Sequence, residues 1–211
     1  VPHLAVADCE RGVMRWGIMG TGGVANAFAE ALHDVPGAEL TEAWSREPPK
    51  ARALLEHVGA PYRGYGRYDH VSSDCAVDIV YVATPASHHY EHTVMALRAG
   101  KHVLCEKPFA MNAGEARGMV YEARERGLFL MEAMWTRFLP SYAQLRVLLE
   151  DGVIGEVRSI DARFGGRAEL APRTRPFRLD LAGGALMDGA VYPISLIQMI
   201  LPLAGTQVHA Y

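Results

Sequence analysis

Apolar and polar positions follow two alternating patterns along most of this 211-residue chain. Short apolar runs are separated by longer segments whose apolar residues recur every three to four positions, as on one face of a helix. The runs predict strands at Met14–Gly20, Ala38–Trp44, Val77–Ala83, Lys101–Cys105 and Leu128–Glu132. The longer segments predict helices at Val24–His33, Pro49–His57, Glu91–Ala99, 113–126 and Pro140–Glu150. This alternation predicts a parallel sheet covered on both faces, which is a doubly wound α/β fold.

Details of the pattern refine the predicted helices and strands. Phe28, Ala31 and Leu32 are expected to form the buried face of the first helix. The run Val77–Ala83 is dense in β-branched residues and is expected to be buried on both faces. Asn112 followed three residues later by Glu115 is typical of a helix that begins with a capping box.

The pattern changes after Gly152. Gly155–Phe164 alternates polar and apolar residues, which predicts a half-exposed antiparallel strand. Ala185–Leu201 predicts a largely apolar helix, and Gln207–Tyr211 predicts the start of a short strand. We therefore expect a first domain over residues 14–134 and part of a second α/β domain over 135–211. Residues 1–13 are expected to be an extension, and the sequence leaves open whether Met14 is the true start.

Composition narrows the classes of partner and compartment. The formal net charge is −3 and the isoelectric point is near 6.3, so there is no basic footprint for nucleic acid or for an anionic membrane. Three scattered cysteines fit a reducing cytoplasm, and we expect a cytoplasmic protein without a membrane anchor. Nine histidines are present, but only His88, His89 and His92 cluster, and no metal site is predicted.

The turn after the first predicted strand has the spacing of a dinucleotide-binding loop. Gly20 permits a tight turn, Gly22 allows backbone to approach a pyrophosphate, and Ala25 keeps the helix close to the strand. The amino end of the following helix offers free N–H groups to an anion. An ordinary glycine-rich turn is the alternative interpretation.

The end of the second predicted strand selects between cofactors. An acidic residue there would bind the ribose hydroxyls of NAD(H), but this chain has Ser45-Arg46. A hydroxyl and a guanidinium both bind phosphate, so the sequence favours NADP(H), with NAD(H) possible. A solvated surface arginine is the alternative.

Two further motifs follow predicted strands, at the edge where open α/β sheets bind ligands. Thr84-Pro85 follows the central strand, and His89 then either hydrogen-bonds to the loop or takes part in chemistry. Glu106-Lys107-Pro108 follows the next strand, and Lys107 is a candidate to hydrogen-bond to a substrate hydroxyl beside a nicotinamide. A solvated lysine is the alternative.

Asp188 and Tyr192 lie four residues apart in the predicted apolar helix, so their side chains are expected to share a face. A buried tyrosine hydroxyl can relay a proton to or from an alcohol or carbonyl oxygen, while hydride transfer belongs to the cofactor. A capping aspartate beside a core tyrosine is the alternative interpretation.

Together these motifs resemble the Gfo/Idh/MocA oxidoreductase family. The resemblance rests on the glycine turn, Thr84-Pro85 with His89, the run 99–108, and Gly183–Asp188 followed by Tyr192. Residues 129–138 are similar to the branch of dimeric dihydrodiol dehydrogenases and NADP-dependent D-xylose dehydrogenases.

The resemblance implies a Rossmann domain, a second domain with a mostly antiparallel sheet, and a cis peptide before Pro108. It implies catalysis by Lys107 and Tyr192 with support from Asp188, and a substrate cleft near Trp135 and Arg137. The expected cofactor-binding residues are Gly20, Thr21, Gly22, Gly23, Val24, Ala25, Ser45, Arg46, Thr84, Pro85, His89, Glu106 and Lys107.

Three functions remain open from the sequence. The first is an NADP(H)-dependent dehydrogenase acting on a sugar or cyclic diol. Full-length relatives in the family form homodimers, and the sequence leaves open whether this chain does. The second is a C-terminally truncated dinucleotide-binding remnant without turnover, because most of the expected second sheet is missing. The third is an interaction protein that exposes a sheet edge. A methyltransferase would leave Glu106-Lys107-Pro108 unexplained.

Overall fold

The computed structural model describes residues 12–60, 64–73, 76–166 and 177–201 of the chain. The chain divides into two units, Val1–Ala133 and Met134–Tyr211. The short strand predicted at Gln207–Tyr211 and nearly all of the predicted extension lie outside the described residues. None of the helices in the described ranges is long and apolar enough to cross a membrane.

A six-stranded parallel sheet forms the first unit. Its strands are β1 (Met14–Met19), β2 (Ala38–Trp44), β3 (Gly64–Gly66), β4 (Ile79–Val82), β5 (His102–Cys105) and β6 (Leu130–Glu132). Their order in the sheet is β3-β2-β1-β4-β5-β6, and every neighbouring pair is parallel. This is the strand order of dinucleotide-binding Rossmann folds, in which the ligand crevice lies where the order reverses, between β1 and β4.

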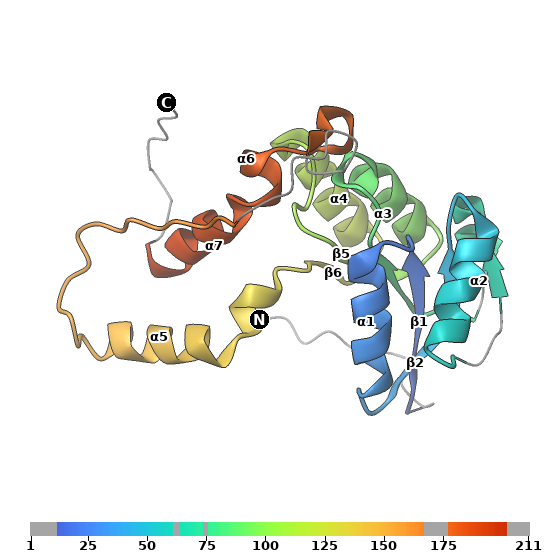
Figure 1. The fold of residues 1–211 in the computed structure, drawn as a ribbon, viewed down its shortest axis with the longest axis horizontal. Coiled ribbons are helices and arrows are strands. Elements are labelled where there is room, and N and C mark those ends of the chain that lie inside the picture. The colour runs from blue at the N-terminus through green and yellow to red at the C-terminus, as the bar shows by residue number, and fades with distance from the viewer. Residues whose placement is uncertain (1–11, 61–63, 74–75, 167–176, 202–211) are drawn as a thin grey trace. The chain divides into compact units, whose positions relative to one another are not determined.

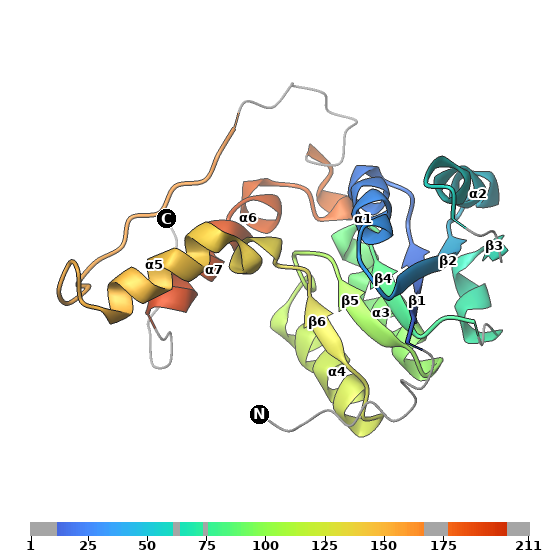
Figure 2. The same ribbon diagram turned by 90° about the horizontal axis from the view of Figure 1, so that it is seen from below.

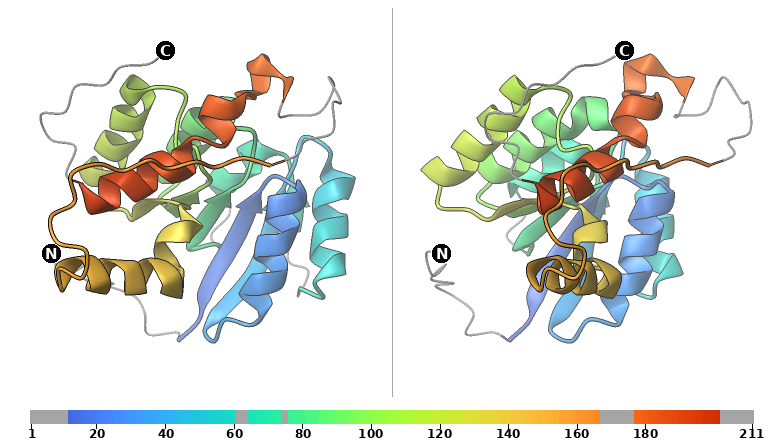
Figure 3. Two further views of the ribbon diagram at one scale, coloured as in Figure 1. Left: turned by 60° about the vertical axis from the view of Figure 1, so that its left-hand side comes forward. Right: turned by 90° about the vertical axis from the view of Figure 1, so that its left-hand side faces the viewer.

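Helices cover both faces of this sheet, as Figure 2 shows. One face carries α1 (Gly23–His33) and α2 (Pro48–His57), and the other carries α3 (His89–Arg98) and α4 (Ala113–Glu125) (Figures 1 and 2). Figure 3 shows α3 and α4 running side by side, in agreement with their contacts. The doubly wound α/β architecture predicted from the sequence is confirmed.

Each face has its own hydrophobic core because neighbouring residues of a strand point to opposite sides of the sheet. Ile18, Ala43 and Tyr81 pack with α1 and α2, whereas Met19, Trp44, Val80 and Val82 pack with α3 and α4. All four residues of β4 are buried. The β-branched run in the sequence is therefore a central strand, as predicted.

The buried face of α1 differs from the prediction. Ala25, Ala29 and Leu32 are its buried residues, Phe28 is half-buried, and Ala31 is exposed. Positions 25, 29 and 32 lie along one side of the helix, and Ala31 is rotated away from that side. Phe28 remains in contact with the sheet through its ring, which stacks on Tyr81 with the centroids 3.9 Å apart.

The amino end of α4 follows its sequence signal closely. The Asn112 side chain accepts a hydrogen bond from the Glu115 backbone N–H at 3.0 Å. The Glu115 carboxylate accepts in turn from the backbone N–H of Met111 at 3.0 Å, one residue before the cap. These bonds satisfy N–H groups that have no partner within the helix.

The second unit contains α5 (Pro140–Glu150), α6 (Ala185–Asp188) and α7 (Val191–Ile200). It also contains two short 3-10 helices, η4 (Trp135–Phe138) and η6 (Leu179–Leu181). The predicted strand over Gly155–Phe164 is not formed, because no segment of the described second unit pairs with it. The mostly antiparallel sheet of this unit stays a prediction.

The prediction of one helix over Ala185–Leu201 is wrong. The chain breaks it at Gly189-Ala190, where Ala190 N–H bonds to the Ala185 carbonyl and Tyr192 N–H bonds to the Gly189 carbonyl at 3.2 Å. Pro193 has no N–H with which to continue the regular ladder to Gly189. Asp188 therefore ends α6, and Tyr192 lies in the first turn of α7.

Candidate cofactor and active site

The turn after β1 brings backbone to the carboxyl end of β4. Gly20 has φ +109°, and a Cβ atom there would lie 2.5 Å from the Ala83 carbonyl oxygen. Its N–H donates to the Trp44 carbonyl at 2.9 Å. Only glycine fits this position, because any side chain would clash with the main chain and would also strain the backbone.

Helix α1 then begins with properties that suit an anion. Gly22 is its N-cap residue and supplies no side-chain cap, and the first turn has no acidic residue. A Cβ atom on Gly22 or Gly23 would meet no protein atom within 4 Å, so the chain is open at these two positions of the helix start. Ala25 is fully buried and holds the helix against the sheet. The exposed helix end has a partial positive charge that attracts phosphate.

Ser45 and Arg46 follow β2 beside this turn. The Ser45 hydroxyl lies 3.5 Å from the Thr21 hydroxyl and accepts from the Glu47 backbone N–H at 3.2 Å. Arg46 is exposed. Burial raises the pKa of the Tyr68 phenol, and the nearby Arg46 guanidinium opposes this effect. A cation and a fixed hydroxyl therefore stand where a ribose or its phosphate would be selected.

Thr84 follows β4 and is held by two histidines. Its hydroxyl lies 2.9 Å from His92 Nδ1, and its carbonyl oxygen lies 2.8 Å from His89 Nε2. Burial, followed by the nearby His88, His89 and Arg46, lowers the pKa of His92 from 6.5 to about 4. His92 is thus neutral at physiological pH.

The loop Glu106-Lys107-Pro108 follows β5, and the Lys107–Pro108 peptide is cis, as the resemblance implied. The Glu106 carboxylate accepts from the Tyr81 hydroxyl at 2.7 Å and from the Lys107 backbone N–H at 3.0 Å. Burial and the Glu106 charge raise the pKa of Tyr81, which stays protonated as a donor. Lys107 is half-buried on this fixed loop.

Tyr81 and Glu132 were not predicted from the sequence, and both hold this loop. Glu132, the last residue of β6, accepts from the Phe109 backbone N–H at 2.9 Å. His89 Nδ1 lies 2.8 Å from the Pro108 carbonyl oxygen, so His89 bonds to the loop, one of its two alternatives. The position of Glu132 at a carboxyl strand end was a usable signal. Tyr81 gave a weaker signal, because its hydroxyl is the one polar side-chain group within the apolar strand β4.

No metal chemistry is indicated by the part of the chain that the structure describes. No group of three or more histidine, cysteine or acidic residues in it has the arrangement to hold an ion. Cys105 is buried and burial raises the pKa of its thiol to about 12, so it remains a thiol.

Within the second unit, the structure gathers three of the predicted residues. The Trp135 indole N–H donates to the Tyr192 hydroxyl at 3.3 Å, and Phe164 packs on the tyrosine ring with centroids 4.7 Å apart. Arg137 Nε donates to the Ser195 hydroxyl at 2.9 Å, one turn along α7. Trp135 and Arg137 are thus anchored to the helix that carries Tyr192. Asp188 lies on the separate helix α6.

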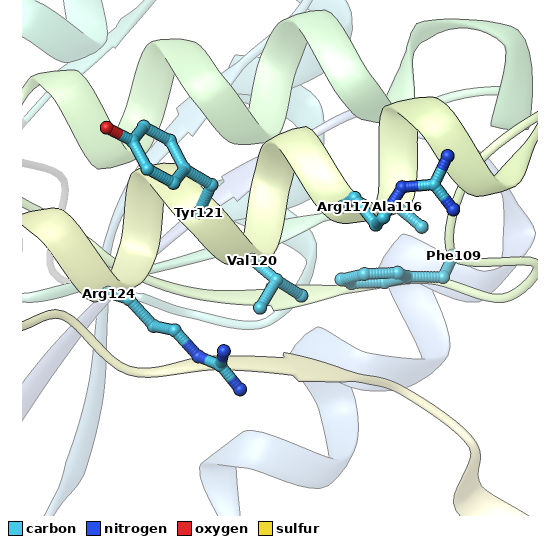
Figure 4. Close-up of a pocket in the computed structure, with 6 residues that line it drawn as sticks. All are labelled: Phe109, Ala116, Arg117, Val120, Tyr121 and Arg124. Carbon is cyan, nitrogen blue, oxygen red and sulfur yellow. The ribbon is translucent and has the colours of Figure 1, made fainter.

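A pocket of about 580 Å³ lies on the first unit, between α4 and Phe109, the residue after Pro108. Figure 4 shows the side chains that line it, which come from α4 and from Phe109. Val120 and Phe109 give it an apolar floor between Arg117 and Arg124. It contains none of the residues predicted for the site.

Comparison with known families gives two matches. The Gfo/Idh/MocA oxidoreductase model with an NAD-binding Rossmann fold matches residues 14–134. The model of the Gfo/Idh/MocA C-terminal domain matches residues 142–211.

Individual relatives agree with these matches. The chain is 40% identical to an NADP(+)-dependent D-xylose 1-dehydrogenase of Hypocrea jecorina over 203 residues, covering 87% of this chain and 52% of the relative. It is 39% identical over 189 residues to a trans-1,2-dihydrobenzene-1,2-diol dehydrogenase of Macaca fascicularis, covering 89% and 56%. The chain spans about half the length of these curated relatives.

Solved structures show the same likeness. A 3-ketoreductase from Actinomadura kijaniata, in complex with NADP and TDP-benzene, superposes with a TM-score of 0.81 at 37% identity. The match covers 89% of this chain and 57% of that chain.

Proposed function

The chain belongs to the Gfo/Idh/MocA oxidoreductase family, and we propose that it is an NADP(H)-dependent oxidoreductase of sugar or cyclic diol CH–OH groups. The observation that carries this proposal is the uncapped amino end of α1 at the reversal point of the sheet. There the chain is open at Gly22 and Gly23, where the helix starts. The partial positive charge of this helix end and the absence of side chains at the two glycines suit a pyrophosphate.

The residues of the first unit fit NADP(H). Gly20–Ala25 would hold the pyrophosphate, and Ser45 with Arg46 would bind the 2′-phosphate of the adenosine ribose. Thr84 and Pro85 would line the crevice at the end of β4, beside the loop Glu106-Lys107, and the buried His89 would join the two segments. When bound, NADP(H) supplies or accepts the hydride at nicotinamide C4.

The protein side chains handle the proton. Tyr192 would exchange a proton with the reacting alcohol or carbonyl oxygen, and Lys107 would hydrogen-bond to a substrate hydroxyl. Asp188 supports Tyr192. Trp135 and Arg137 contact the substrate, and their bonds to α7 hold both residues and Tyr192 together. Positioned acid–base groups of this kind contribute roughly 100- to 10,000-fold to rate.

The names of the relatives suggest substrates. One relative is named for D-xylose and the other for trans-1,2-dihydrobenzene-1,2-diol. Both compounds carry a secondary alcohol beside a second hydroxyl group on a ring. We propose that this chain oxidises a substrate of the same class.

The test is the formation of NADPH from NADP+ with each of these two compounds. We expect turnover with at least one of them, and a loss of roughly 100-fold or more in kcat for Lys107→Ala and for Tyr192→Phe. Lys50→Ala is the matched control, because Lys50 is an exposed lysine on α2 that pairs with Glu47. That variant should keep full activity.

Two outcomes would contradict the proposal in different ways. Binding of NADPH without turnover of any such substrate would make the chain a dinucleotide-binding module. Turnover that survives Lys107→Ala unchanged would remove Lys107 from the chemistry while leaving the cofactor assignment intact.

A further inference from the structure

His89 is a buried histidine that joins two loops of the proposed cofactor crevice. It is the first residue of α3 and its exposed fraction is 1%. Its Nε2 lies 2.8 Å from the Thr84 carbonyl oxygen, and its Nδ1 lies 2.8 Å from the Pro108 carbonyl oxygen. One ring therefore spans from the end of β4 to the loop that carries Lys107.

Both partners of the ring are acceptors. A carbonyl oxygen has lone pairs and no hydrogen, and a neutral imidazole has only one N–H. In either neutral tautomer, one ring nitrogen would direct its lone pair at a carbonyl oxygen 2.8 Å away. The imidazolium form donates at both nitrogens, and hydrogen bonds from a charged donor are the stronger kind.

Charged and titratable groups lie on the elements around His89. On its own element, His92 is held neutral, and the nearness of His89 is one cause of that. Across the crevice, the loop after β5 carries the Glu106 carboxylate and the Lys107 ammonium, and β6 ends with the Glu132 carboxylate. Two carboxylates thus accept hydrogen bonds from backbone N–H groups of this loop, and His89 bonds to the Pro108 carbonyl of the same loop.

We propose that His89 is a permanently doubly protonated imidazolium at neutral pH and that it positions Lys107 by tying its loop to the end of β4. Without the second N–H, either the Pro108 or the Thr84 carbonyl would lose its donor, and His89 would no longer tie the loop to the end of β4. The charge of His89 follows from the geometry of its two hydrogen bonds, whereas the positioning of Lys107 for catalysis rests on the proposed function.

The charge is tested on the unaltered 211-residue chain by NMR with ¹⁵N-labelled histidine. We expect one of the nine histidine rings to show two imidazolium-type nitrogens at about pH 7.5, each with a slowly exchanging N–H. Nuclear Overhauser contacts to Thr84 and Pro108 identify that ring as His89 without any substitution. A neutral tautomer for this ring would overturn the proposal.

The positioning role is tested with His89→Gln, which can donate to only one of the two distant carbonyls. We expect kcat to fall by roughly 100-fold, the loss that a misplacement of about 1 Å produces, while the Kd for NADPH changes less than about threefold. The adjacent His88→Gln is the control and should leave both quantities unchanged. Unchanged kcat in a folded His89→Gln protein would overturn the positioning role.

The two measurements separate this proposal from the proposed function. If the unaltered chain shows no turnover, the proposed function fails, and the NMR result still decides the charge of His89. If His89→Gln does not fold, the NMR measurement on the unaltered chain remains decisive for the double donation on which the positioning role depends.

Discussion

Arg46 decides which cofactor the crevice accepts if the proposed function is right. It is an exposed cation next to Ser45, whose hydroxyl is fixed by the Glu47 backbone N–H. A guanidinium binds a phosphate dianion through two parallel hydrogen bonds but gains little from a ribose hydroxyl. Arg46→Ala should therefore weaken NADPH binding by roughly 1.5–3 kcal/mol, about 10- to 150-fold, and NADH binding much less.

The measurement is the Kd of each cofactor from titration of the protein. Arg52→Ala is the matched control, because Arg52 is an exposed arginine on α2 that pairs with Glu56. It should change neither Kd. Equal losses for NADPH and NADH in Arg46→Ala would remove the 2′-phosphate assignment.

His92 is expected to make the free energy of unfolding depend on pH. Its pKa is lowered from 6.5 to about 4 in the folded chain, so the unfolded chain binds the proton more readily. The stability that this group contributes is fully present above pH 6.5 and is lost as pH falls towards 4. Between about pH 7 and pH 4.5 the free energy of unfolding should fall by about 2 kcal/mol through His92 alone.

Urea unfolding at the two pH values measures this loss. His92→Asn keeps a polar group near Thr84 but does not titrate, so its stability should depend less on pH by about the same 2 kcal/mol. A His92→Asn protein with unchanged pH dependence would show that other groups cause the acid loss.

Single residues also show which contacts could be predicted from the sequence and which could not. The tight turn at Gly20 could be predicted from motif spacing, because the turn chemistry is local. The partners of Tyr81 and Glu132 could not, since they lie 25 and 23 residues away in the chain. The two acceptors of His89 are likewise visible only once β4 and β5 lie side by side.

At the scale of elements, α4 depends on its amino-terminal cap. Asn112 accepts from the Glu115 N–H, and Glu115 accepts from the Met111 N–H. Asn112→Ala removes the first of these bonds and leaves an N–H without its partner. We expect a loss of about 1 kcal/mol in the free energy of unfolding, measured by urea titration.

Asn112→Ser and Asn112→Asp provide the comparison, because both side chains cap helices about as well as asparagine. They should keep most of the stability that Asn112→Ala loses. Equal losses in all three variants would place the effect in packing at this position and not in the cap.

The four helices and five of the six strands of the parallel sheet were predicted because their apolar periods agree with their tertiary positions. The edge strand β3, of three residues, is too short to show such a period and was not predicted. The second unit was harder to predict. A half-exposed pattern at Gly155–Phe164 indicates a strand only if a partner strand exists, and a strand cannot satisfy its backbone alone. The break at Gly189-Ala190 depends on the missing N–H of Pro193, which the apolar pattern of Ala185–Leu201 does not reveal.

At the scale of the whole molecule, cofactor binding should appear as added stability. A ligand at about one hundred times its Kd stabilises the native state by roughly 2.7 kcal/mol, which corresponds to a rise of about 5–10 °C in Tm for a chain of this size. We expect this rise with NADPH and a smaller one with NADH at the same concentration. Differential scanning fluorimetry of the 211-residue chain measures both.

The pattern of transitions adds a second result. The glycine turn, Ser45-Arg46 and the loop Glu106-Lys107 all belong to the first unit, so the transition of that unit should move with NADPH. Arg46→Ala should reduce the NADPH shift to the size of the NADH shift, because the 2′-phosphate is the only difference between the cofactors. No shift with either cofactor would mean that an uncapped helix end and open space do not suffice for binding, and the proposed function would then lose its main support.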